Sequence, residues 1–410
     1  MPTFDYRICR FETSANRTRL AYRKKKDRCF YHSQVFGRLG DPGEPQTRAQ
    51  VECFSDSGTN RCRKYPTLWE TSRHPLRETH TIRAGNLYDA EVGARAATSR
   101  GSATTERMEN GRGRLPAGGI STDIPSENIL VAFNNPSAVR VYRIKQDFTP
   151  GEEVIQPSPI DAGIFAHQVR TTPDNRLAIL VTRGNEGTPT KAEDPGALKV
   201  FNYKDGVLTN EVSIAPDGGK EFGPRHLDFH PTKPWMYVSI ETQNKMYMYR
   251  IEKGGINPEV AYRSETLAEP NNIRARQAAG TVHVHPNGRF IYGANRAEAT
   301  TEFQGKQVFK GGENSIVAYA IDPSIGEPIP IQHIETQKIH PRTFHIDPSG
   351  RLLVAQHNLP VNVRDGDAVK TIPAGLSVFR VGDDGKLTFA RKYDIDVGDK
   401  TMFWMGMVPL

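Results

Sequence analysis

The stretch Gly223–Asn244, GPRHLDFHPTKPWMYVSIETQN, contains the pattern that decides the fold. Apolar and polar residues alternate along HLDFH, a turn with two prolines follows, and a second apolar run ends at Glu241. Alternation with a period of two is typical of β-strands, and a short turn of this composition joins antiparallel neighbours. The segment therefore predicts a β-hairpin with polar residues at both of its open ends.

Related hairpins recur along the chain, and their turn prolines lie about 55 to 62 residues apart. Each is followed by a further alternating segment, such as Leu198–Tyr203 or Met246–Ile251. Short strands repeated at this period predict four-stranded antiparallel sheets stacked around an axis. We therefore expect an all-β fold, a β-propeller with about five recognisable blades and no helix of three turns. The four copies of the hairpin are His167–Asn185, Arg225–Gln243, His283–Arg296 and Arg342–His357.

The charge of the chain is unevenly distributed. Residues 1–118 contain 22 Lys and Arg against 13 Asp and Glu, whereas the other residues contain 32 against 34. The net charge of +7 therefore arises in the N-terminal segment, and the strand-rich region lacks the broad basic surface of a nucleic-acid-binding protein. We expect two parts: residues 1–118, an irregular, basic segment that is disordered or unrelated to the rest, and residues 119–410, the propeller.

Composition excludes several other classes. The cysteines (Cys9, Cys29, Cys53 and Cys62) lack the close pairs of zinc sites, so we expect no structural metal. No apolar run approaches the roughly 18 to 20 residues of a membrane span, and the first residues lack a signal-peptide core. These features predict a cytoplasmic protein without a membrane or nucleic-acid partner, and leave its oligomeric state open.

Four segments resemble a known family: AHQVRTTPDNRLAILV, GPRHLDFHPTKPWMYVSIETQN, VHVHPNGRFIYGANR and HPRTFHIDPSGRLLVAQ. They are similar, in register over several blades, to the seven-bladed propeller lactonases, which include 6-phosphogluconolactonases and carboxymuconate-cyclizing enzymes. The resemblance covers about residues 120–410. It implies a propeller fold and an enzyme that acts on a small-molecule lactone without a cofactor.

Strand direction alone indicates where the site lies. Within a blade the second strand runs antiparallel to the first, so the start of the first and the end of the second share one edge. The resemblance assigns catalysis to four residues at such positions: His167 in AHQ, Arg225 in GPRH, Glu241 in SIET and Arg296 in GANR. The same criterion gives four candidate substrate-binding residues: Arg183, Asn244, Arg342 and His357.

These residue types suit the opening of a lactone. The reaction needs a base that activates water, which either His167 or Glu241 can supply. It also needs donors for the substrate's carboxylate or phosphate and for the oxyanion, and Arg225 and Arg296 provide forked ones. No metal is required.

Three insertions follow second strands and are expected on the edge that carries the site: Asn185–Gly196, Glu298–Gly312 and Asn358–Ala374. They are long enough to narrow the entrance, so they bear on which lactone is accepted. The leading hypothesis is a hydrolase of a sugar-acid lactone such as 6-phosphogluconolactone. An isomerase of the carboxymuconate cyclase type and a propeller that only binds remain as alternatives.

Overall fold

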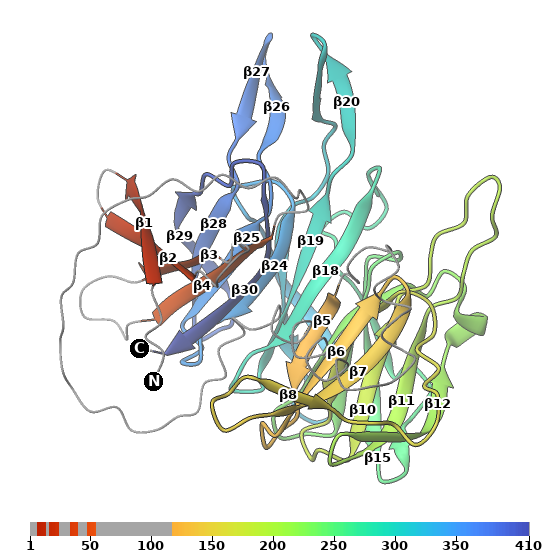
Figure 1. Cartoon of the computed structure of the whole chain (residues 1–410). Helices are drawn as coiled ribbons and strands as arrows, with labels where there is room; N and C mark the ends of the chain where they lie inside the picture. The colour runs from red at the N-terminus through yellow and green to blue at the C-terminus, as the bar shows by residue number, and fades with distance from the viewer. Residues whose placement is uncertain (1–5, 14–15, 24–32, 40–46, 55–116, 410) are drawn as a thin grey trace. The chain divides into compact units, whose positions relative to one another are not determined.

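The computed structural model describes residues 6–13, 16–23, 33–39, 47–54 and 117–409. Within these ranges the regular structure is β, apart from a short 3-10 turn at Pro216–Gly219. Five antiparallel sheets of the blade type succeed one another from residue 117 to residue 394 (Figure 1). The prediction of an all-β chain with about five recognisable blades is therefore confirmed.

The described residues form two compact units. The first unit comprises residues 117–265 and 321–329, and the second comprises the other described residues. In each blade the first strand pairs with the second, the second with the third, and the third with the fourth. Consecutive segments are thus neighbours in one sheet, as the alternating pattern predicts.

The first unit contains three blades. In the third of them, β16 and β17 both pair with β15 and share the place of the fourth strand. The strands are β5 (Ala117–Thr122), β6 (Asn128–Asn134), β7 (Ser137–Ile144) and β8 (Pro150–Glu153); β9 (Ala166–Thr171), β10 (Leu177–Thr182), β11 (Ala197–Lys204) and β12 (Val207–Ile214); and β13 (Pro224–Phe229), β14 (Trp235–Ile240), β15 (Lys245–Glu252), β16 (Gly255–Ile256) and β17 (Tyr262–Glu265).

The second unit contains two blades and two inserted hairpins. The blade strands are β18 (Gln277–Val284), β19 (Phe290–Ala297), β22 (Ser315–Ile321) and β23 (Pro328–Glu335), then β24 (Pro341–Ile346), β25 (Leu352–His357), β28 (Gly375–Val381) and β29 (Leu387–Asp394). The inserted hairpins are β20 (Thr300–Phe303) with β21 (Lys306–Phe309), and β26 (Val361–Asp365) with β27 (Ala368–Ile372).

A further sheet joins the two ends of the described chain in the order β1–β2–β3–β4–β30. Its last strand, β30, contains the terminal apolar segment MFWMGMVP (Met402–Pro409). Four of its strands lie within residues 1–118, the segment predicted to be irregular, and residues 55–116 of that segment lie outside the described residues. A boundary near residue 118 stays a prediction. The strands are β1 (Tyr6–Thr13), β2 (Asn16–Arg23), β3 (Ser33–Leu39), β4 (Thr47–Phe54) and β30 (Thr401–Pro409).

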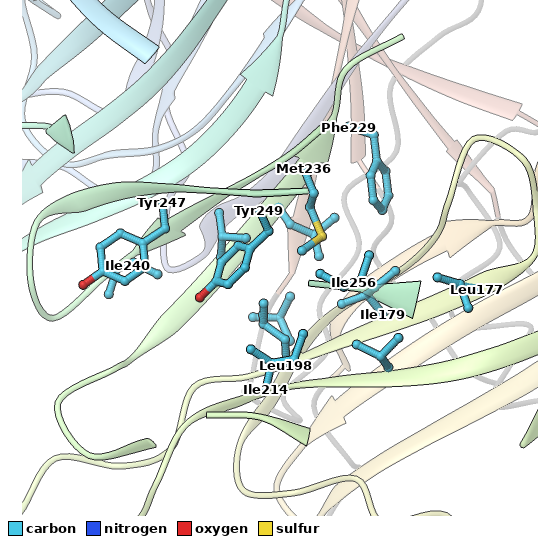
Figure 2. Packing of buried hydrophobic residues seen from close by; sticks show 14 of the residues in the cluster. Leu177, Ile179, Leu198, Ile214, Phe229, Met236, Ile240, Tyr247, Tyr249 and Ile256 are labelled. Atoms are coloured by element: carbon cyan, nitrogen blue, oxygen red, sulfur yellow. The ribbon is translucent and has the colours of Figure 1, made fainter. Parts of the chain in front are cut away.

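Apolar side chains hold neighbouring sheets face to face. Every residue of the second strands β10, β14 and β25 is buried, because these strands are covered on both faces. In the first unit, Ile179 and Leu198 of one blade pack with Met236 and Tyr249 of the next (Figure 2). Each such side chain contributes roughly 1.5–3 kcal/mol by leaving water. The packing fixes the strands whose ends carry the candidate site.

Two buried tyrosines on adjacent strands of this core differ in their hydrogen bonding. Tyr237 donates from its hydroxyl to the Gly326 carbonyl at 2.9 Å, whereas the buried Tyr249 hydroxyl has no hydrogen-bond partner among the described residues. Burial raises the pKa of both phenols, so both stay neutral at ordinary pH. We expect Tyr237→Phe to lower the free energy of unfolding by about 1–2 kcal/mol, because it leaves a buried carbonyl unpaired.

Tyr249→Phe is the matched control. It removes a hydroxyl that makes no described bond, so we expect the free energy of unfolding to stay the same or to rise. Urea unfolding of both variants measures the difference. Equal destabilisation by the two substitutions would contradict this account of the core.

Candidate functional site

In each blade the pairing of the first and second strands is irregular near the start of the first strand, and several predicted site residues lie at this irregularity. In the second blade Ala166 pairs with Thr182 and Gln168 with Val181, so His167 is left out of the ladder. Arg225 is left out in the same way between Pro224 and His226. A bulge of this kind bends a strand and redirects the side chain of the extra residue. The residues predicted from strand starts are therefore bulge residues.

The same irregularity recurs in the other blades with different residues at the bulge. Arg342 occupies it in the last blade, Gly118 occupies it in the first, and Gly280 with Thr281 lies opposite Ala294 in the fourth. The backbone feature is thus repeated, while the side chain that it presents changes from blade to blade.

Arg183 and Glu241 directly follow the second strands β10 and β14. Because the pairing is antiparallel, each lies next to the bulge of its own blade, as the sequence predicts. The corresponding residues elsewhere are Asn134 at the end of β6, Arg296 near the end of β19 and Asn358 just after β25.

In the first unit these positions form an ionic cluster around Glu241. Its Oε1 accepts a hydrogen bond from Nη1 of Arg225 at 2.9 Å, and its Oε2 accepts one from Nη1 of Arg183 at 3.4 Å. The side chains of Arg225 and Glu241 are 5% and 9% exposed, against 22% for Arg183. The carboxylate therefore holds two guanidinium groups from two adjacent blades.

His167 is the buried imidazole of this cluster, with 7% exposure. Its ring meets that of His226 edge-on at a centroid distance of 4.8 Å. His226 in turn accepts at Nδ1 a hydrogen bond from Nε of Arg225 at 3.4 Å. The Arg183 guanidinium stacks over the Phe165 ring at 4.6 Å, and Phe165 also lies 6.3 Å from His167. One continuous set of contacts thus joins the imidazole to the Arg–Glu pairs.

Asn244 is also buried in the first unit, in the turn that precedes β15. Its φ of +54° lies in the left-handed region, which asparagine tolerates better than most residues. This conformation gives the residue a structural reason to be asparagine, and its substrate-binding role stays a prediction.

The remaining predicted residues belong to the second unit. Arg296 is 7% exposed, and Arg342 stacks over the Phe403 ring at 4.6 Å. His357 is completely buried: Nδ1 bonds to the Ile339 carbonyl at 3.0 Å, and Nε2 lies 3.2 Å from Ser377 Oγ. These bonds within its own blade favour a structural role for His357 over the predicted contact with substrate. The catalytic role of Arg296 and the binding role of Arg342 stay predictions.

Sequence reasoning missed Asn134 and Asn358, which take the same register position as Arg183 and Glu241. The signal was present, because the second strands NILVAFN, LAILVTR, WMYVSIE and LLVAQHN align end to end. In the last of these, His357 is the final strand residue and Asn358 is the one that corresponds to Glu241. The terminal polar residue of the strand was therefore assigned one position too early.

Two of the predicted insertions form β-hairpins that contact each other. The hairpins β20–β21 and β26–β27 extend side by side from their blades (Figure 1). Gln304 donates to the Asp367 carbonyl at 2.8 Å, Asn362 donates to the Gln307 carbonyl at 3.3 Å, and Arg364 stacks over Phe303 at 4.5 Å. These hairpins follow Arg296 and His357 closely in the chain, so each begins at the second-strand end of its blade. This is the edge at which the sequence predicts the insertions to lie.

The first insertion is a shorter loop of the first unit, closed by bridges between Asn185 and Asp194 and between Thr188 and Lys191. Asp194 accepts hydrogen bonds from Lys191 and Asn185, which lower the pKa of its carboxyl. Lys191 and Asp194 thus form an ion pair within the loop.

No helix among the described residues is long and apolar enough to cross a bilayer. These residues also contain no cluster of three or more His, Cys, Asp or Glu side chains arranged to hold a metal ion.

Comparison with known proteins places the chain in one family. The model of the family described as lactonase, 7-bladed beta-propeller, matches residues 96–364. The 6-phosphogluconolactonase of Bacillus subtilis is 27% identical over 269 residues, which cover 63% of this chain and 70% of that protein. That of Cronobacter sakazakii is 25% identical over 252 residues, or 60% and 66% of the two chains. The chain spans about two thirds of the length of these relatives.

A solved structure supports the fold. The periplasmic gluconolactonase of Pseudomonas aeruginosa matches with a TM-score of 0.50 and 18% identity, over 71% of this chain and 72% of that chain. The resemblance stated from the sequence is therefore confirmed for the family and for the fold.

The burial of the Arg–Glu pairs predicts unequal effects on stability. Glu241→Ala leaves the buried guanidinium of Arg225 without its carboxylate, and we expect the free energy of unfolding to fall by about 3–5 kcal/mol. Arg183→Ala breaks a longer bond at a more exposed side chain, and we expect a loss of about 1 kcal/mol. Chemical denaturation of both variants measures this difference, and similar losses would contradict the assignment of Arg225 as the buried partner.

The burial of His357 predicts a dependence of stability on pH. Burial lowers its pKa from 6.5 to about 3 in the folded chain, so below pH 6.5 the unfolded chain binds more protons. The free energy of unfolding should therefore fall as the pH decreases from 6.5, by about 2 kcal/mol from this residue at pH 5.

The substitution His357→Gln removes this titration. We expect the free energy of unfolding of the variant to vary less between pH 7 and pH 5 than that of the parent, although the variant is less stable at pH 7. Denaturant titrations at several pH values measure both slopes. Parallel curves for parent and variant would show that His357 does not contribute.

Proposed function

Because the chain belongs to the lactonase family of seven-bladed β-propellers, we propose that it is a lactone hydrolase whose substrate is a sugar-acid lactone, such as 6-phosphogluconolactone. The observation that carries the proposal is the contact set of the first unit, in which a buried imidazole, two arginines and a glutamate from neighbouring blades meet. The names of the curated relatives support the same substrate class.

His167 is the general base of the proposed reaction. A neutral imidazole takes a proton from water as the water oxygen forms a bond to the lactone carbonyl carbon. When the tetrahedral intermediate collapses, the bond from that carbon to the ring oxygen breaks, and the imidazolium returns the proton to the leaving oxygen. The product is the open hydroxy acid, and His167 is neutral again.

Glu241 is less suited to be the base, because both of its oxygens already accept hydrogen bonds from guanidinium groups. We assign it the role of orienting Arg225 and Arg183. Their remaining N–H groups can stabilise the oxyanion or bind the carboxylate or phosphate of the substrate. The hydrogen bond from Arg225 to His226 places this guanidinium beside the two imidazoles.

The activity is tested by proton release from a panel of lactones at pH 7, after subtraction of the spontaneous rate. The panel contains δ-gluconolactone, its 6-phosphate and a muconolactone. We expect the parent to open the sugar lactones and His167→Gln to lower kcat by about 10²- to 10⁴-fold. Arg176→Ala, an exposed arginine paired with Asp174, is the control and should keep activity within twofold of the parent.

The outcomes separate the hypotheses. A parent that rearranges muconolactone without opening sugar lactones would favour the isomerase. A folded parent that leaves every lactone unchanged would favour a propeller that only binds. Retention of full kcat by His167→Gln, with the parent active, would exclude His167 as the base. Parallel assays of Arg296→Ala test whether this residue of the second unit takes part.

A further inference from the structure

Asn134 is the residue of the first blade that corresponds to Arg183 and Glu241. Ala117 pairs with Phe133 in this blade, as Ala166 pairs with Thr182 and Pro224 with Ile240 in the next two. In each blade the residue that follows this pair on the second strand is polar. The position that supplies two members of the ionic cluster therefore supplies an amide in the first blade.

The side chain of Asn134 is not satisfied by the fold. Its Oδ1 is buried, and no hydrogen-bond partner for it lies among the described residues. An unpaired buried acceptor destabilises a protein by about 1–3 kcal/mol, so its presence needs an explanation, and a bound ligand or an ordered water is one. Arg183 and Glu241, by contrast, bond to each other. Within the first unit, Asn134 is thus the residue at this position whose acceptor is unused in the described structure.

The local contacts bring Asn134 to the strand that carries His167. Asn134 pairs with Ser137 across the β6–β7 hairpin. The Ser137 hydroxyl accepts a hydrogen bond from the backbone N–H of Ala166 at 2.9 Å and donates one to the Ala162 carbonyl at 2.9 Å. The hairpin end is therefore tied to the residue next to His167.

Two glycines allow this close approach. A Cβ at Gly119 would lie 2.6 Å from the His167 carbonyl oxygen, and one at Gly118 would lie 2.9 Å from that of Ala166. Strand β5 can therefore pack directly on the backbone of β9. Because the bulge residue of this blade is Gly118, Asn134 is the side chain that the blade can offer at this edge.

We propose that Asn134 is a specificity-determining residue that accepts a hydrogen bond from a hydroxyl group of a polyhydroxylated lactone. This inference rests on the proposed lactonase function and narrows its substrate class. A sugar lactone carries several O–H donors, whereas the carboxylate of a muconolactone only accepts. A buried acceptor at this site therefore favours a sugar lactone over a muconolactone, since the latter would leave it unpaired.

Substitutions at Asn134 combined with two substrates test the proposal. We expect Asn134→Ala to lower kcat/KM for δ-gluconolactone by about ten- to a hundredfold, and kcat/KM for δ-valerolactone, which has no hydroxyl groups, by less than threefold. Asn134→Asp retains two acceptor oxygens and should stay within about threefold of the parent on δ-gluconolactone. The exposed Asn202, replaced by alanine, is the matched control in the same unit.

Two outcomes would overturn the assignment. An equal loss on both substrates would mean that Asn134 acts on folding or on the reacting group, not on a hydroxyl. A loss in Asn134→Asp as large as in Asn134→Ala would mean that the amide N–H donates to the substrate. Thermal unfolding of each variant shows whether it is folded, and removal of an unsatisfied acceptor should not lower Tm.

Binding of δ-gluconolactam, which resists hydrolysis, separates this inference from the proposed function. Calorimetry should give a Kd that Asn134→Ala weakens by about ten- to a hundredfold. If the parent binds the lactam through Asn134 but opens no lactone, the proposed hydrolase activity is wrong, whereas the hydroxyl-binding role of Asn134 is supported. If the parent is an active hydrolase and Asn134→Ala binds the lactam normally, only the role of Asn134 fails. A parent that neither binds nor reacts overturns both.

Discussion

The candidate site depends on a bulge at the start of the first strand of each blade. In a regular antiparallel pair, alternate side chains point to opposite faces of the sheet, and here both faces are occupied by neighbouring sheets. A residue at such a position would be absorbed into the core. The bulge takes His167 and Arg225 out of this alternation, next to the ends of the second strands. The register therefore decides which polar residues can leave the core without breaking the sheet.

The second requirement is that charge at this edge be paired. Arg225 and Glu241 are both nearly inaccessible to water, and an isolated charge there would cost several kcal/mol. The ion pair of Arg225 and Glu241 within one blade offsets this cost, and the further hydrogen bond from Arg183 connects the neighbouring blade to Glu241. Because both of its oxygens accept hydrogen bonds from guanidinium groups, Glu241 is better suited to hold arginines than to accept a proton. This is why the proposed mechanism assigns the proton transfer to the imidazole of His167, which lies against the rings of His226 and Phe165.

Much of the fold and part of the site could be predicted from the sequence. The segment Gly223–Asn244 gave the strands and the turn of its blade, because apolar alternation and proline are local signals. The proximity of Arg225 and Glu241 followed from antiparallel pairing alone. Register within the last blade did not follow, because His357 and Asn358 are both polar and only the pairing shows which of them ends the strand. The pairing of the two long hairpins also escaped prediction, since it depends on contacts between segments about 60 residues apart, such as that of Gln304 with Asp367.

The two edge positions argue for function rather than packing. Across the five blades the bulge position holds Gly118, His167, Arg225, Gly280 with Thr281, and Arg342, and the second position holds Asn134, Arg183, Glu241, Arg296 and Asn358. Five residues earlier on the same second strands, the side chain is apolar and buried in every blade, because it fills the space between sheets: Ile129, Ala178, Met236, Ile291 and Leu353. A scaffold that required only solubility would accept almost any polar residue at its edges. In the first unit, Arg225 and Arg183 instead bond to Glu241, Asn134 has an unused acceptor, and the residues at these positions differ from blade to blade. Within the first unit, a repeated backbone thus carries unequal polar residues, as the proposed recognition of an asymmetric small molecule requires.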